Sequence, residues 1–85
     1  MPPERARCWY NLGLALNLAG RSEDGLVALT RAESLSPEDP RIPYARATIL
    51  ARLGKTDEAR QATERALQIQ PDYPPAAELL RSLQN

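Results

Sequence analysis

The sequence predicts an all-α domain built from repeated helical hairpins, and three observations lead to this fold class. The chain aligns with itself when it is shifted by 34 residues, and apolar residues recur at helical spacing within each copy. The apolar side chains are mainly Leu and Ala, with no Phe, which favours helices over strands. At 85 residues the chain forms one domain at most.

The 34-residue repeat is the strongest pattern in the chain. Two turns of the same chemistry, GRSED at 20–24 and GKTDE at 54–58, align without a gap. Other aligned pairs are Arg7 and Arg41, Tyr10 and Tyr44, Ala28 and Ala62, Ala32 and Ala66, Leu35 and Ile69, and Pro37 and Pro71. We therefore interpret residues 1–85 as a single domain with repeat 1 at 6–39, repeat 2 at 40–73 and a last helix at 74–85.

A glycine and a proline bound the two helices of repeat 1. The first helix is expected at about 5–19 and ends at Gly20, a residue suited to the left-handed conformation that follows a helix. Ser22 is expected to cap the second helix, and the two acidic residues after it favour the positive end of the helix dipole. This helix is expected to continue to about Ser36, because Pro37 cannot extend it.

Repeat 2 follows the same scheme with one irregularity. Asp39 is expected to cap the third helix, and Pro40 fits its first turn, where a missing N–H costs little. Pro43 fits only if this helix begins late or has an irregular first turn. Gly54 is expected to end the third helix, and Thr56 to cap the fourth.

A glycine in the middle of the first helix costs about 0.8–1 kcal/mol relative to alanine. A close crossing of the two helices of the hairpin would offset this cost, since small residues let two backbones approach. The alternative is a tolerated glycine with no packing role. The small residues expected at the two crossings are Gly13 with Gly25 and Ala32, and Ala47 with Ala59 and Ala66.

Thirty-four residues of helix–turn–helix resemble the tetratricopeptide repeat, with its pattern W-x2-L-G-x2-Y, then A-x3-F, A and P. The positions that match or stay small are Trp9, Leu12, Gly13, Ala32 and Pro37 in repeat 1, and Ala47, Ala59, Ala66 and Pro71 in repeat 2. The departures include Leu16, Gly25 and Leu29 in repeat 1, and Pro43, Arg46 and Thr63 in repeat 2. The resemblance covers about residues 6–84 and implies a right-handed α-solenoid of two repeats plus a C-terminal capping helix, five helices in all.

The fifth helix, at about 74–83, is expected to cap the stack. The position that matches Gly13 and Ala47 in this helix is Arg81, a bulky charged residue that a close helix crossing would exclude. Arg81 is instead expected to face water, as the polar end of a helical solenoid requires.

The first helix carries apolar residues nearly all the way round, which is typical of a helix with neighbours on several sides. We expect its open side to be covered by preceding repeats of a longer parent protein or by self-association. Its apolar residues are Cys8, Trp9, Leu12, Leu14, Ala15, Leu16, Leu18 and Ala19.

The composition argues against catalysis. The chain has no His, the usual general base and the commonest metal ligand. Cys8 is the only cysteine, which excludes an internal disulfide and, without His, the ordinary thiol dyad. Acidic pairs at 23–24, 38–39 and 57–58 lie at helix starts, where capping explains them. We expect no enzyme, no cofactor and no metal site.

The charge balance gives no sign of nucleic-acid or membrane binding, since 11 basic residues face 11 acidic ones. No apolar run approaches the roughly 20 residues that span a bilayer. Residues 1–7 lack the apolar core of a secretory signal. The expected location is the cytoplasm, unless a longer protein carries a targeting segment elsewhere.

By resemblance, the first helix of each repeat lines a concave groove that binds partners. The exposed groove positions expected are Arg7, Tyr10, Asn11, Leu14, Asn17 and Leu18 from the first helix, Arg41, Tyr44, Ala45, Thr48 and Arg52 from the third, and Glu78 and Ser82 from the last. Tyr10 and Tyr44 are expected to stack along the groove beside the arginines, and both residue types are enriched at binding hot spots. The alternative is that the tyrosines pack between helices and the arginines are solvated.

The resemblance implies a protein–protein interaction module that binds a peptide segment or a partner protein in the groove. One alternative is a structural C-terminal segment of a longer solenoid with no ligand of its own, and another is a regulatory appendage of an enzyme in a parent chain. Family members that bind heat-shock chaperone tails use a Lys, Asn, Asn, Lys and Arg clamp. The matching positions are Tyr10, Leu14, Ala45, Pro75 and Leu79, so this clamp is not expected.

Overall fold

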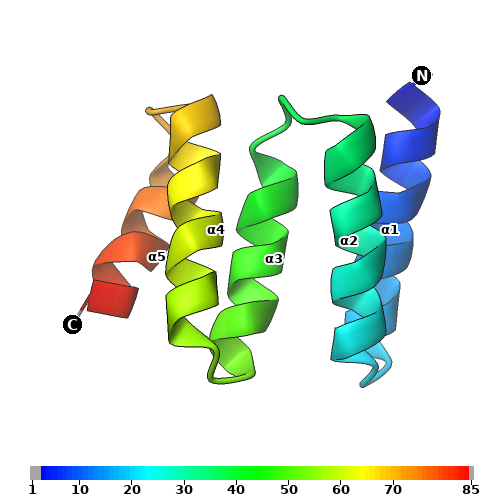
Figure 1. Cartoon of the computed structure of the whole chain (residues 1–85), viewed down its shortest axis with the longest axis horizontal. Coiled ribbons are helices and arrows are strands. Elements are labelled where there is room, and N and C mark those ends of the chain that lie inside the picture. Colours follow the sequence, from blue (N-terminus) through cyan, green and yellow to red (C-terminus); the bar gives the residue numbers. More distant parts are fainter. Residues whose placement is uncertain (1–2, 85) are drawn as a thin grey trace.

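Five α-helices make up residues 3–84, the part of the chain that the computed structural model describes (Figure 1). They are α1 (Pro3–Leu18), α2 (Ser22–Leu35), α3 (Arg41–Arg52), α4 (Thr56–Ile69) and α5 (Pro74–Gln84). No strand occurs in this described range, which confirms the all-α class. The predicted domain bounds at residues 1 and 85 lie outside it, and the repeat boundaries at 39/40 and 73/74 stay predictions.

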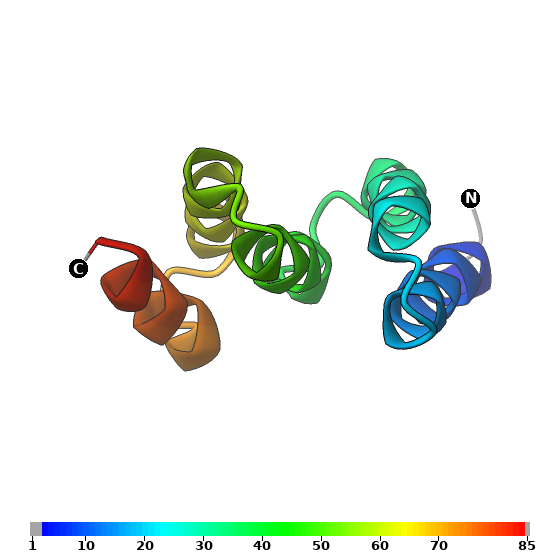
Figure 2. The ribbon, with the colours of Figure 1, turned by 90° about the horizontal axis from the view of Figure 1, so that it is seen from below.

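The helices zigzag between two layers. α1, α3 and α5 lie on one side of the stack, and α2 and α4 lie on the other (Figure 2). Each helix packs on the next one along the chain, and α3 also touches α1 and α5. The stack measures 36 × 28 × 16 Å. Because α3 is set back between α1 and α5, the side formed by these three helices is concave (Figure 2).

Glycine turns end α1 and α3 as predicted, with φ of 84° at Gly20 and 81° at Gly54. The predicted caps at Ser22 and Thr56 are wrong, since the N-cap residues are Arg21 and Lys55 and neither makes a side-chain cap bond. The reason is the turn itself. The amide of Arg21 donates to the carbonyl of Leu16 at 2.8 Å, so the residue after the glycine already closes α1 and the next residue starts α2.

The start of α3 accommodates its proline without distortion. Pro43 is the third residue of the helix, in the first turn, where backbone N–H groups have no partner within the helix. The N-cap residue is Pro40 rather than the predicted Asp39, and the helix begins one residue later, at Arg41. Asp39 still satisfies the start of α3, because its Oδ1 accepts the backbone N–H of Arg41 at 3.0 Å. The predicted irregular first turn is therefore not needed.

The predicted close crossing is confirmed in the first hairpin. A Cβ atom built on Gly13 would lie 2.9 Å from the carbonyl oxygen of Gly25, and one on Gly25 would lie 2.7 Å from that of Gly13. The side chain of Leu29 is the other near neighbour of Gly13, and the predicted contact with Ala32 stays a prediction. The α1 and α2 backbones are therefore in direct contact, which offsets the poor helix propensity of glycine.

The second hairpin crosses at alanines. Ala47, Leu50, Ala59 and Ala62 form one buried cluster, in which Ala62 takes the place predicted for Ala66. Leu79 and Leu83 of α5 pack against this cluster and close the end of the stack. Arg81 of α5 is exposed, as its register predicts.

A second buried cluster joins the two hairpins. It consists of Leu29 from α2 with Ala45 and Ile49 from α3. Leu14 packs against its edge from α1, and an ion pair between Glu33 and Arg46, 2.9 Å apart, lies beside it. The relative position of α1 and α3, and with it the concave face, depends on this contact.

Candidate functional site

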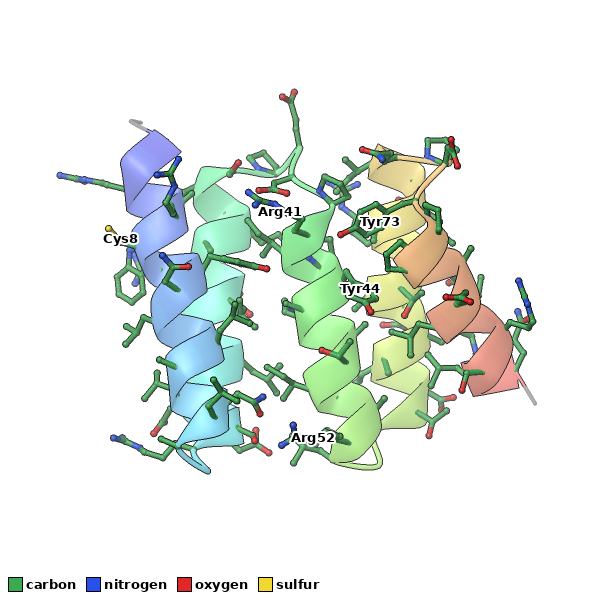
Figure 3. The ribbon with its side chains drawn as sticks, turned by 180° about the vertical axis from the view of Figure 1, so that it is seen from behind. Cys8, Arg41, Tyr44, Arg52 and Tyr73 are labelled. Carbon is green, nitrogen blue, oxygen red and sulfur yellow. The ribbon has the colours of Figure 1, made fainter. Side chains whose placement is uncertain are left out.

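The upper half of the concave face is a cluster of tyrosines around one arginine. Tyr44 of α3 and Tyr73, just before α5, point toward each other (Figure 3). Their ring centroids are 5.8 Å apart and their planes meet at 85°, an edge-to-face pair. The guanidinium carbon of Arg41 lies 5.5 Å from the centroid of the Tyr10 ring, within cation–π range. We call Tyr10, Arg41, Tyr44 and Tyr73 the aromatic cluster.

The predicted stacking of Tyr10 on Tyr44 is wrong. α1 and α3 are not consecutive helices and touch only weakly, and the Arg41 side chain of α3 lies over the Tyr10 ring of α1. Tyr44 pairs instead with Tyr73, which the sequence analysis did not identify as a site residue. The repeat gives no signal for Tyr73, because its counterpart one repeat earlier is Asp39. The sequence did hold one signal for Tyr73, because this residue directly precedes Pro74 and Pro75, where α5 begins.

Asp39 fixes the direction of Arg41. The Nε and Nη2 atoms of Arg41 donate to the two carboxylate oxygens of Asp39 at 3.0 and 2.7 Å. These side-chain bonds hold the pKa of Asp39 below its usual value, against the opposing effect of its burial. Burial raises the pKa of Tyr73, and the neighbouring Tyr10 and Tyr44 add to the shift. At neutral pH the Tyr73 phenol therefore stays neutral, and Arg41 presents an oriented cation.

The lower half of the concave face is polar. Asn17 accepts a hydrogen bond from Ser22 Oγ at 2.8 Å, and Arg52 Nη2 lies 3.5 Å from the same Asn17 oxygen. Among the described side chains no carboxylate lies within ion-pair distance of Arg52, and the residue is exposed. The Arg52 guanidinium therefore keeps most of its donor groups for other partners.

The remaining predicted groove residues differ in exposure. Leu14 and Thr48 are half-buried, and Thr48 Oγ1 donates to the carbonyl of Ala45 at 2.8 Å. Ala45, predicted as an exposed groove position, is only 5% exposed, because its methyl group packs in the cluster with Leu29 and Ile49. The exposed predicted positions are Arg7, Asn11, Leu18, Glu78 and Ser82. Asn11 follows Cys8 at helical spacing and so shares its side of α1, away from α3 (Figure 3).

In the described part of the chain, no group of three or more His, Cys, Asp or Glu side chains comes together in a way that could hold a metal ion. Across residues 3–84, none of the helices combines the length and the apolar character that crossing a membrane demands. Cys8 is a free, exposed thiol on the outer edge of α1, away from α3 (Figure 3).

The tetratricopeptide repeat family model matches residues 16–83, so the protein belongs to this family. A search of curated proteins gives no match. Similar solved structures include the second tetratricopeptide repeat domain of Spaghetti (RPAP3) bound to the HSP90 peptide SRMEEVD. It has a TM-score of 0.91 at 18% identity, over 96% of this chain and 76% of that one.

The first such domain of Spaghetti (RPAP3), bound to the same peptide, is also similar, with a TM-score of 0.61 and 18% identity. This match covers 99% of the present chain and 94% of the other. At this identity the two likenesses concern the fold. Together with the family match and the five helices, they confirm a tetratricopeptide repeat solenoid of the kind that serves as a protein-binding scaffold.

Proposed function

We propose that the protein is an interaction module that binds a short polypeptide segment across its concave face, without catalysis. The observation that supports this most is the aromatic cluster. Tyrosine and arginine side chains supply large, rigid contact areas and are enriched at binding hot spots. Here they are half-buried or exposed and are already oriented by one another and by Asp39.

The spacing of the two arginines sets the length of the bound segment. Arg41 and Arg52 are the first and last residues of α3, which separates them by about 16 Å along the helix axis. An extended segment of about five residues spans this distance. We expect apolar or aromatic side chains of the ligand at the aromatic cluster and a carboxylate or carbonyl near Arg52. A contact surface of this size predicts a Kd on the order of micromolar or weaker.

The HSP90 peptide SRMEEVD, which both Spaghetti structures hold, is a useful negative probe. The positions that match the clamp of chaperone-binding members carry no basic or amide side chain. Tyr10 is half-buried, Leu14 packs on the core, and Ala45 is buried. We therefore expect SRMEEVD to bind at least tenfold more weakly than a peptide selected on this protein.

The test is a selection of random 12-residue peptides on the immobilised full chain, followed by calorimetry with the selected peptides. We expect Tyr44→Ala to weaken binding at least tenfold and Arg52→Ala about three- to tenfold. The matched control is Arg65→Ala on α4, an exposed arginine of the opposite layer, which should have no effect. Selected peptides that lose affinity with Arg65→Ala but not with Tyr44→Ala would contradict the proposal.

A further inference from the structure

The α2–α3 contact shows how one helix of this stack receives another on its side. Three positions of α3 form the receiving face, Ala45, Arg46 and Ile49. The buried Ile42 precedes them at the same helical spacing, so we count it as the fourth position of this face. Ala45 and Ile49 pack directly on Leu29 of α2, and Arg46 pairs with Glu33.

The same face of α1 is uncovered. The residues 34 positions earlier are Cys8, Asn11, Leu12 and Ala15, and all four are exposed, Leu12 by 45%. We call these four residues the open face of α1. It lies on the side of α1 away from α3, where Figure 3 places Cys8. Within residues 3–84, therefore, no helix covers on α1 the positions that α2 covers on α3.

We propose that the open face of α1 binds an amphipathic helix of a partner protein in the pose that α2 takes against α3. The open face of α1 continues the interface between α2 and α3 by one repeat. α1 and α3 align residue by residue at a shift of 34. A helix placed on α1 as α2 is placed on α3 would therefore contact the open face in the same way. The side chains that differ between the open face of α1 and the receiving face of α3 then determine which helix fits.

All four residues of the open face differ from their counterparts on α3, and two of these differences specify the partner helix. Leu12 stands where α3 has Arg46, so a carboxylate in the place of Glu33 would be desolvated without its cation. The partner therefore carries an apolar residue there. Ala15 stands where α3 has Ile49, which leaves room for a side chain larger than Leu29. The partner helix thus presents an aromatic or methionine side chain and, four residues later, an aliphatic one.

The chain provides two reporters at this face. Trp9, the only tryptophan, is half-buried beside the face with the Arg31 guanidinium 5.5 Å from its ring centroid. Cys8, the only cysteine, is exposed within the face itself. A docked helix should shift the Trp9 fluorescence and slow the alkylation of Cys8.

The experiment titrates the full chain with two helix-stabilised peptides that copy residues 20–37, the segment around α2. One keeps the natural sequence and the other carries Leu29→Phe and Glu33→Leu. We expect the substituted peptide to bind at least tenfold more tightly, with a Trp9 shift and protection of Cys8. Introducing Leu12→Arg into the protein restores the charge found at position 46, and the preference between the peptides should reverse.

Two controls keep the result decisive. Gln61→Arg places the same charge on the exposed side of α4 and should change neither affinity. Ala15→Glu alters an exposed residue, so the fold should persist while both peptides lose binding. Equal affinities, an unchanged preference after Leu12→Arg, or no binding at all would overturn the proposal. A concentration-dependent dimer that Leu12→Arg abolishes would also overturn it, because a second copy would then cover the face.

Discussion

In both hairpins of this protein the two helices cross closely, but the residues at the crossing differ. In the first, Gly13 and Gly25 bring the backbones of α1 and α2 into contact. One repeat later the equivalent residues are Ala47 and Ala59, whose methyl groups fill the crossing of α3 and α4. The crossing therefore requires small residues, and the size of the residue sets how closely the helices approach.

The hairpins also differ in the residue that the second helix buries at equivalent positions. Leu29 of α2 is fully buried against α3, so the first hairpin anchors the second. Its counterpart on α4 is Thr63, equally buried, with its hydroxyl bonded to the carbonyl of Ala59 at 2.7 Å. A leucine therefore joins the two hairpins, whereas a threonine occupies the equivalent position on α4.

Leu29→Ala should have the largest effect, because it removes the central side chain of the contact between the hairpins. We expect the free energy of unfolding in urea to fall by about 2–5 kcal/mol. This is a large part of what a domain of this size possesses. A loss below about 1 kcal/mol would contradict the role assigned to this contact.

Gly25→Ala should come next, although alanine is the better helix former by about 1 kcal/mol. The new methyl group would sit 2.7 Å from the Gly13 carbonyl oxygen, a backbone atom that moves only if the helices separate. We expect a net loss of about 1–3 kcal/mol by urea denaturation. Ala59→Gly, the reverse exchange in repeat 2, should also destabilise. If Gly25→Ala stabilised the protein, the close crossing would be disproved.

Asp39→Ala should cost about 1 kcal/mol at pH 7, since the carboxylate accepts the first N–H of α3 and lies at its positive end. The folded-state pKa of Asp39 is lowered, so its contribution is present above the unfolded value near 3.8. It is lost as the pH falls through the lower folded value. Stability curves of the variant and the wild type should therefore converge as the pH falls below the lowered folded-state pKa of Asp39. The exposed neighbour Glu38→Ala serves as the control.

Thr63→Val should have the smallest effect and the opposite sign. The hydroxyl bonds a carbonyl of its own helix, so replacing it with a methyl group of similar size leaves no buried polar atom unpaired. We expect a gain below about 1 kcal/mol, seen as a rise of a few degrees in Tm. A clear loss would indicate that the hydroxyl has another function.

The sequence was enough to predict the helices and the crossing, because both follow from spacing along the chain. The caps were not predictable from Ser22 and Thr56, since the glycine turns already occupy the preceding residues. Only some residues of the aromatic cluster could be predicted from the sequence. Tyr10 and Arg41 follow the repeat, whereas Tyr73 lies in a connection outside the helical register. Ala45 is buried because of a neighbour in another hairpin, which no local pattern reveals.

The most direct test of the account is a map of amide chemical shifts in the full chain during titration with a peptide selected on it. The account predicts joint shifts at Tyr10, Arg41, Tyr44 and Arg52, with Tyr73 responding alongside them. Shifts confined to α2 and α4, with these five residues unchanged, would contradict binding on the concave face.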